Sequence, residues 1–151
     1  MCVRASSSLP GMMRPIAING HVMLDGGLGI GAGLPTHLAE MDGYEKIFLL
    51  ATRPQGYRKV PASPRMRHLY KHWERTYPLM AEALLTRWSR YNAALDHLSE
   101  LEHEGLALVV RPDQMQVTST TLDTQKLRHA YLMGHDQGMR ELSRWEKFIF
   151  G

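Results

Sequence analysis

Cysteine is nearly absent from this chain. Cys2 is the one cysteine among 151 residues. No disulfide can therefore form within the chain, and a zinc site built from several cysteines is excluded. This usage suits a reducing compartment.

Long apolar runs are missing as well. No stretch approaches the roughly 18 consecutive apolar residues that a membrane-spanning helix needs. The first ten residues contain no apolar core of the kind found in secretory signal peptides. We therefore predict a cytoplasmic protein, with peripheral contact as its one route to a membrane.

A strong charge bias is absent too, since the formal net charge is only +3. The sequence has no arginine-rich arm, and nucleic acid is not a predicted partner. The basic stretch from Arg53 to Arg75 stands out locally, with seven Arg or Lys residues against the single acid Glu74. Such a stretch can attract an anionic membrane surface, with Trp73 as an interfacial anchor. The alternative is an ordinary solvated helix.

What is present is a regular alternation of strand and helix signals. Asn19-Gly20 is a strong hairpin signal between two short apolar runs, and Ser63-Pro64 has the pattern of a helix start. A β-α-β passage is predicted between Val22 and Ala51. The predicted strands are residues 16–18, 21–24, 46–52 and 106–110, and the predicted helices are residues 3–9, 35–42, 64–75, 80–98 and 127–149. Residues 120–123 have capping-box spacing before the last helix. The fold class is α/β.

The chemistry is expected at Asp25. This carboxylate follows a short apolar run that starts at His21, and Gly26 and Gly27 come directly after it. An aspartate between a strand and a glycine-rich turn is a common place for a functional group. The plain structural alternative is a loop aspartate that forms an Asx-turn with its own backbone.

The nucleophile that would complete such a site is missing. No Gly-x-Ser-x-Gly motif, the strand-to-helix turn that exposes a reactive serine, occurs in the sequence. Ser6, Ser7 and Ser8 lack the flanking glycines, and no glycine-rich oxyanion loop precedes them.

The segment 3–59 resembles the C-terminal half of the catalytic domain of patatin-like phospholipases. The motifs that carry the resemblance are the serine run before Pro10, the Asp-Gly-Gly motif Asp25-Gly26-Gly27, the proline-started helix at Pro35, and the run that begins with Thr52-Arg53-Pro54. The resemblance implies part of a three-layer α/β/α sandwich in residues 1–60, with a helix-rich C-terminal region in residues 61–151. It also implies lipid acyl-ester hydrolysis by a Ser-Asp dyad without metal or cofactor. Asp25 would be the activating base, and the serine would lie in a segment N-terminal to the one matched. We therefore expect a fragment that does not hydrolyse lipid alone. The alternative is a non-catalytic pseudoenzyme or interaction module.

Two further interpretations remain open. The glycine-rich run between Gly27 and Gly33 fits a loose dinucleotide fingerprint, although no acidic residue follows the next strand to hold a ribose. His68 and His72 are four residues apart and would share a helix face, as a metal pair does. No carboxylate stands at the spacing of an HExxH motif, and the sequence favours a solvated basic face over a metal pair.

Overall fold

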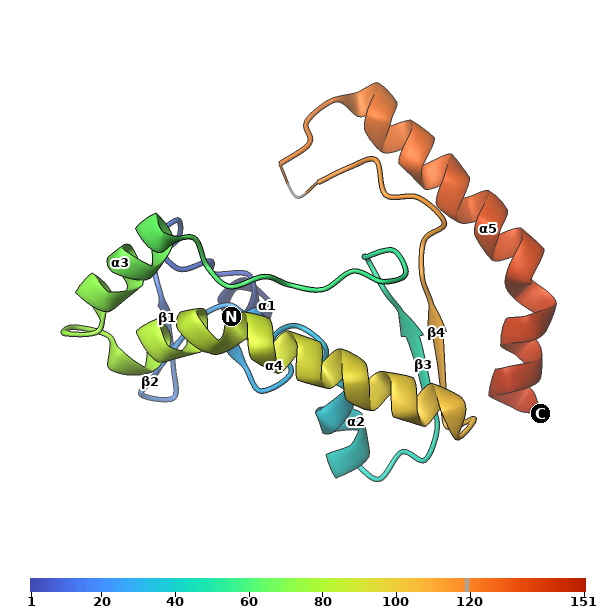
Figure 1. Ribbon diagram of the computed structural model, residues 1–151, viewed down its shortest axis with the longest axis horizontal. Helices are drawn as coiled ribbons and strands as arrows, with labels where there is room; N and C mark the ends of the chain where they lie inside the picture. The colour runs from blue at the N-terminus through green and yellow to red at the C-terminus, as the bar shows by residue number, and fades with distance from the viewer. Residues whose placement is uncertain (119) are drawn as a thin grey trace. The chain divides into compact units, whose positions relative to one another are not determined.

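The computed structural model describes residues 1–118 and 120–151 and has a mixed α/β fold (Figure 1). The chain divides into two compact units. Unit 1 comprises Met1–Tyr44 and Arg58–His97, and unit 2 comprises Glu45–Tyr57 and Leu98–Gly151. In the part of the chain that the structure describes, no helix is both long and apolar enough to cross a membrane.

Unit 1 contains short elements and most of one long helix. Its elements are α1 (Cys2–Ser6), β1 (Ile16–Ile18), β2 (His21–Met23), the 3-10 turn η1 (Gly26–Leu28), α2 (Thr36–Met41), α3 (Pro64–Trp73) and the part of α4 (Pro78–His103) up to His97. Helix α1 is shorter than the predicted helix over residues 3–9. The other predicted elements of this unit are present within two residues of their expected ends, except that α4 continues five residues beyond the predicted helix over residues 80–98.

The hairpin β1–β2 has the predicted turn. Asn19 and Gly20 both have positive φ, 50° and 78°, and the strands pair antiparallel with Ile16 opposite Met23. Positive φ at both central positions matches the twist of the two strands. The hairpin therefore fixes where β2 ends, two residues before Asp25.

Helix α3 begins as predicted, and its tryptophan packs against the loop before β1. Ser63 Oγ accepts a hydrogen bond from Met66 N–H at 3.4 Å, and Pro64 occupies the first turn. Trp73 was a candidate membrane anchor. Its ring packs over Gly11, where an added Cβ would lie 2.9 Å from Trp73 Cη2. Its ring therefore helps to hold the loop before β1.

Unit 2 is built on a parallel pair of strands. β3 (Ile47–Leu50) pairs with β4 (Ala107–Val110), with Ile47 opposite Ala107 and Leu50 opposite Val110. All four β4 residues are buried. The predicted β-α-β passage is wrong in its pairing, because β2 and β3 belong to separate two-stranded sheets. The parallel partner of β3 is supplied from much later in the chain.

The long C-terminal helix α5 (Thr124–Phe150) is capped by an aspartate. Asp123 Oδ1 accepts hydrogen bonds from the N–H groups of Gln125 and Lys126, at 2.9 and 3.2 Å. The capping box expected to start at Thr120 is therefore wrong. A carboxylate that accepts two of the free N–H groups caps the helix directly.

Gln137 joins α5 to the segment after β4. Its Nε2 donates to Arg111 O at 2.8 Å, and its Oε1 accepts from Asp113 N–H at 3.1 Å. Its Nε2 also donates to Glu141 Oε1 at 2.9 Å. The side chain is buried, so these bonds replace water in fixing the chain as it leaves the sheet.

Gln137→Leu is expected to lower the free energy of unfolding by about 1–3 kcal/mol, because Arg111 O and Asp113 N–H would lose their partner in a site of restricted water access. Urea unfolding followed by circular dichroism measures this loss. Gln125→Leu, at an exposed position of the same helix, is the control and should change stability little. Equal losses in the two variants would contradict the role given to Gln137.

Candidate functional site

Asp25 lies at the start of η1 and is held at both its backbone and its side chain. Its N–H donates to Ser8 O at 3.0 Å, and its Oδ1 accepts from Gly27 N–H at 2.8 Å. This second bond is the Asx-turn of the structural alternative. This bond uses only Oδ1 of the carboxylate. Within the described residues, Oδ2 accepts no hydrogen bond. The group is half-buried.

The neighbouring serines do not complete the site. Ser6 and Ser7 donate their hydroxyl protons to Val3 O, and Ser8 Oγ donates to Arg4 O at 2.9 Å. Each hydroxyl is therefore bonded to the carbonyls of α1 rather than to Asp25. The structure brings Ser8 next to Asp25 through the backbone alone.

A hollow of about 540 Å³ adjoins the residues that follow Asp25. It is lined by Gly26, Gly27, Gly29, Ile30, Gly31, Gly33, Leu34, Pro35, His37 and Leu38. A mostly apolar hollow of this size is in the range of small-molecule sites. The His37 Nδ1 atom is buried and has no hydrogen-bond partner among the described residues, so the hollow combines apolar walls with one unsatisfied polar atom.

Two arginines of α4 donate hydrogen bonds to backbone carbonyls of the glycine loop. Arg87 Nε donates to Gly27 O at 3.1 Å, and Arg90 Nη1 donates to Leu28 O at 2.9 Å. A Cβ on Gly27 would lie 2.7 Å from both Arg87 Nη2 and Asp25 Oδ1. Position 27 therefore requires a glycine for the arginine and the aspartate to approach it together.

A second anchor comes from the chain before α3. Lys59 Nζ donates to Ala32 O at 3.1 Å and lies 3.7 Å from the Tyr91 ring centroid. The Asn92 side chain bonds both the N–H and the C=O of Lys59, each at 2.9 Å.

The neighbouring Arg58 pairs with α4 as well. Its Nη2 donates to Asp96 Oδ1 at 2.5 Å, and this hydrogen bond raises the pKa of the Arg58 guanidinium above its ordinary value. Helix α4 thus binds both the glycine loop and the basic segment that contains Arg58 and Lys59.

These contacts argue against the nucleotide interpretation. The cations that would meet a phosphate bind backbone carbonyls of the loop instead. Helix α2, which follows the loop, has only six residues, so its dipole offers little to an anion.

The metal interpretation gains no third ligand. His68 and His72 are both exposed on α3. Among residues 1–118 and 120–151, no group of three or more His, Cys, Asp or Glu side chains could hold a metal ion.

Sequence reasoning missed the arginines of α4. Arg87 lies four residues before Tyr91, which belongs to a row of apolar residues spaced by three and four along the predicted helix over residues 80–98. A guanidinium on an otherwise apolar face needs acceptors, and exposed loop carbonyls supply them. An arginine on this apolar face is the sequence signal that could have predicted its contact with the loop.

Residues 77–150 match the model of a family described as a domain of unknown function, DUF6363. The matched segment includes α4, β4 and α5 and leaves out the loop that carries Asp25. No curated protein and no solved structure matches the chain.

Proposed function

We propose that this chain supplies the base of a serine esterase of the patatin-like type and acts on lipid acyl esters. Asp25 is the base, in a Ser-Asp dyad, and its position supports the proposal. The carboxylate is half-buried at the exit of a hairpin, one oxygen is fixed by Gly27 N–H, and the apolar hollow follows directly. An acyl chain would occupy that hollow.

The chemistry assigned to Asp25 is proton transfer. A serine hydroxyl donates its proton to Oδ2 as its Oγ attacks the ester carbonyl carbon. The proton then passes to the leaving alcohol, which departs from the acyl-enzyme, and water releases the acid by the same route. The Gly27 N–H bond keeps the carboxylate in one orientation throughout.

Exposed apolar side chains beside Asp25 support the proposal that a further segment packs against this surface. Val22 and Ile30, on either side of Asp25 in the sequence, are each 70% exposed, and the β1–β2 sheet has two strands. In the patatin-like sandwich that we propose, the segment with the nucleophile would cover these apolar side chains. Contact with a membrane through the stretch from Arg53 to Arg75 belongs to the same proposal, with Arg65 and Arg67 exposed on α3.

Complementation tests the proposal. The chain is co-expressed with a segment bearing the Gly-x-Ser-x-Gly motif of such a domain, and hydrolysis of p-nitrophenyl butyrate is measured. We expect Asp25→Asn to lower kcat by about 10²–10⁴-fold, the usual contribution of a general base. Asp42→Asn, at the exposed end of α2, is the matched control and should keep full activity.

The alternative function is that of a non-catalytic interaction module. The observed Asx-turn favours it, because this bond gives Asp25 a structural task that needs no nucleophile. Undiminished turnover in Asp25→Asn would reject the dyad. Complemented chains that bind the segment but never turn over the ester would favour the module.

A further inference from the structure

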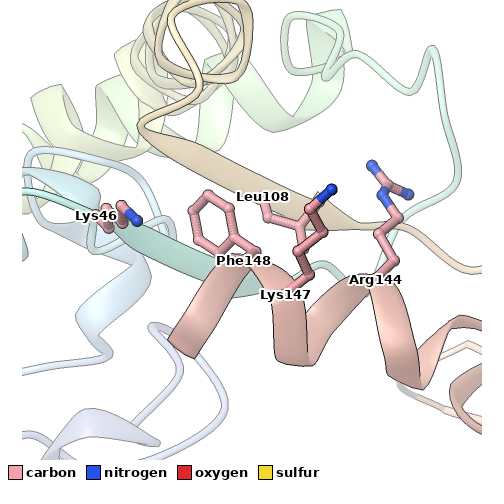
Figure 2. Close-up of a pocket in the computed structure, with 5 residues that line it drawn as sticks. All are labelled: Lys46, Leu108, Arg144, Lys147 and Phe148. Atoms are coloured by element: carbon pink, nitrogen blue, oxygen red, sulfur yellow. The ribbon is translucent and has the colours of Figure 1, made fainter. Parts of the chain in front are cut away.

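Unit 2 contains a second pocket, at the end of α5 beside the β3–β4 sheet. Its volume is about 300 Å³, and it is lined by three cationic and two apolar side chains: Lys46, Arg144, Lys147, Leu108 and Phe148. Figure 2 shows Lys46 on one side of the Phe148 ring and Lys147 and Arg144 on the other. No acidic side chain is among the described residues that line it.

The positive charges of this pocket are largely uncompensated. In the described part of the chain, no carboxylate forms an ion pair with Lys46 or Lys147. Arg144 Nη1 lies 3.7 Å from Glu141 Oε2, and its side chain is 63% exposed. Glu141 also accepts from Gln137 and Trp145, so it offsets the Arg144 charge only in part.

The lysine before β3 contacts the aromatic wall of the pocket. Lys46 Nζ lies 5.7 Å from the Phe148 ring centroid, a cation–π distance. The C-terminal end of a helix carries about half a negative charge, and here Gly151 N–H already bonds Lys147 O at 3.1 Å. Three side-chain cations outweigh that partial charge.

The rest of the lining is apolar. Leu108 is 6% exposed in β4, and Phe148 is half-buried. The pocket volume is about ten times the share of a water molecule in the liquid. That space holds one anionic group with an aromatic or short aliphatic neighbour, and it is too small for a complete acyl chain.

We propose that this pocket binds an organic phosphate monoester. The phosphate would face Lys46, Lys147 and Arg144, and the carbon attached to it would lie against Phe148 and Leu108. A phosphate monoester carries about 1.5–2 negative charges near pH 7 and offers three acceptor oxygens, which suits a pocket lined by three cations better than a carboxylate does. A free metabolite and a lipid head group share this chemistry. The site lies in unit 2 and does not depend on the role of Asp25.

Calorimetric titration at low salt compares phenyl phosphate, inorganic phosphate and benzyl alcohol. Phenyl phosphate should bind about fivefold or more tightly than either of the others, because it alone engages both the cations and the apolar wall. Lys46→Gln combined with Lys147→Gln should weaken its binding about tenfold or more. Lys126→Gln combined with Arg128→Gln removes the same charge from exposed positions of α5 and should leave binding within about twofold.

Protection from acetylation tests the site without any substitution. Phenyl phosphate should slow the modification of Lys46 and Lys147, measured by mass spectrometry, and leave that of Lys126 unchanged.

Sedimentation with phosphatidylcholine vesicles, with and without phosphatidic acid, distinguishes a lipid head group from a free phosphate metabolite. Binding to the phosphatidic acid vesicles that is lost when Lys46→Gln and Lys147→Gln are combined identifies a lipid head group as the ligand. Binding of phenyl phosphate without binding to these vesicles identifies a free phosphate. No binding of phenyl phosphate, equal weakening by both double variants, or absence of protection would overturn the proposal.

Discussion

Replacing Gly31 with alanine is expected to lower the free energy of unfolding by about 3 kcal/mol or more. A Cβ on Gly31 would lie 1.8 Å from Leu34 O and 3.2 Å from His37 Nδ1. The nearer atom belongs to the backbone, in a turn closed by the 3.0 Å bond from Leu34 N–H to Gly31 O. Relief therefore requires the buried turn itself to move, since no flexible side chain can give way.

Gly26→Ala is the matched control, because nothing lies within 4 Å of a Cβ at that position. It should change stability by no more than about 0.5 kcal/mol. Hydrogen exchange of the loop amides and thermal unfolding measure both variants. Similar stability of the Gly31 and Gly26 variants would show that the loop can rearrange around the added methyl group.

Local signals in the sequence predicted local structure well. The Asn19-Gly20 turn, the Ser63-Pro64 helix start and the long helix over residues 80–98 all depend on a few neighbouring residues and on helical periodicity. Their physical causes are contained in the segment itself. The mixed α/β class followed from the same signals.

Pairing between distant segments was not predictable in this way. β3 and β4 are separated by two helices, and no local pattern shows which strand will pair with which. The false assignment of β2 and β3 to one β-α-β passage came from their closeness in sequence. The observed sheets place β2 with β1 and β3 with β4.

The covered face of α5 was also misjudged. Apolar residues recur at steps of three and four along the predicted helix over residues 127–149, a pattern that predicts a packed face, yet Tyr131 is 69% and Ile149 is 49% exposed. The helix instead turns toward the protein a face that includes Gln137 and Glu141, whose side chains make hydrogen bonds. Polar residues that are buried for their hydrogen bonds are invisible to a hydrophobicity pattern.

The candidate site was predictable in part. The position of Asp25 at the exit of a hairpin followed from the sequence, as did the glycine turn after it. The arginines that bind this turn come from a helix about 60 residues later. Their identity depends on tertiary contacts, and a single sequence does not reveal these.

Arg90→Ala is expected to lower the free energy of unfolding by about 2–3 kcal/mol, since hydrogen bonds to a charged group are the stronger ones. Arg90 Nη1 donates to both Leu28 O and Gly29 O. Its Nη2 donates to Ala83 O at 2.7 Å, and its Nε donates to Thr86 Oγ1 at 3.2 Å. One guanidinium thus fastens the glycine loop to α4, and its loss leaves Leu28 O without its donor, while Gly29 O keeps only the bond from Ala32 N–H.

Arg90→Lys separates charge from geometry in this contact. A lysine keeps the positive charge, but a single ammonium group cannot reach acceptors on both the loop and the helix as the planar fork does. It should therefore recover less than half of the stability lost in Arg90→Ala. Arg67→Ala, at an exposed position of α3, should change stability little. Full recovery by lysine in chemical unfolding would show that long-range charge, rather than the fork of hydrogen bonds, holds the loop against α4.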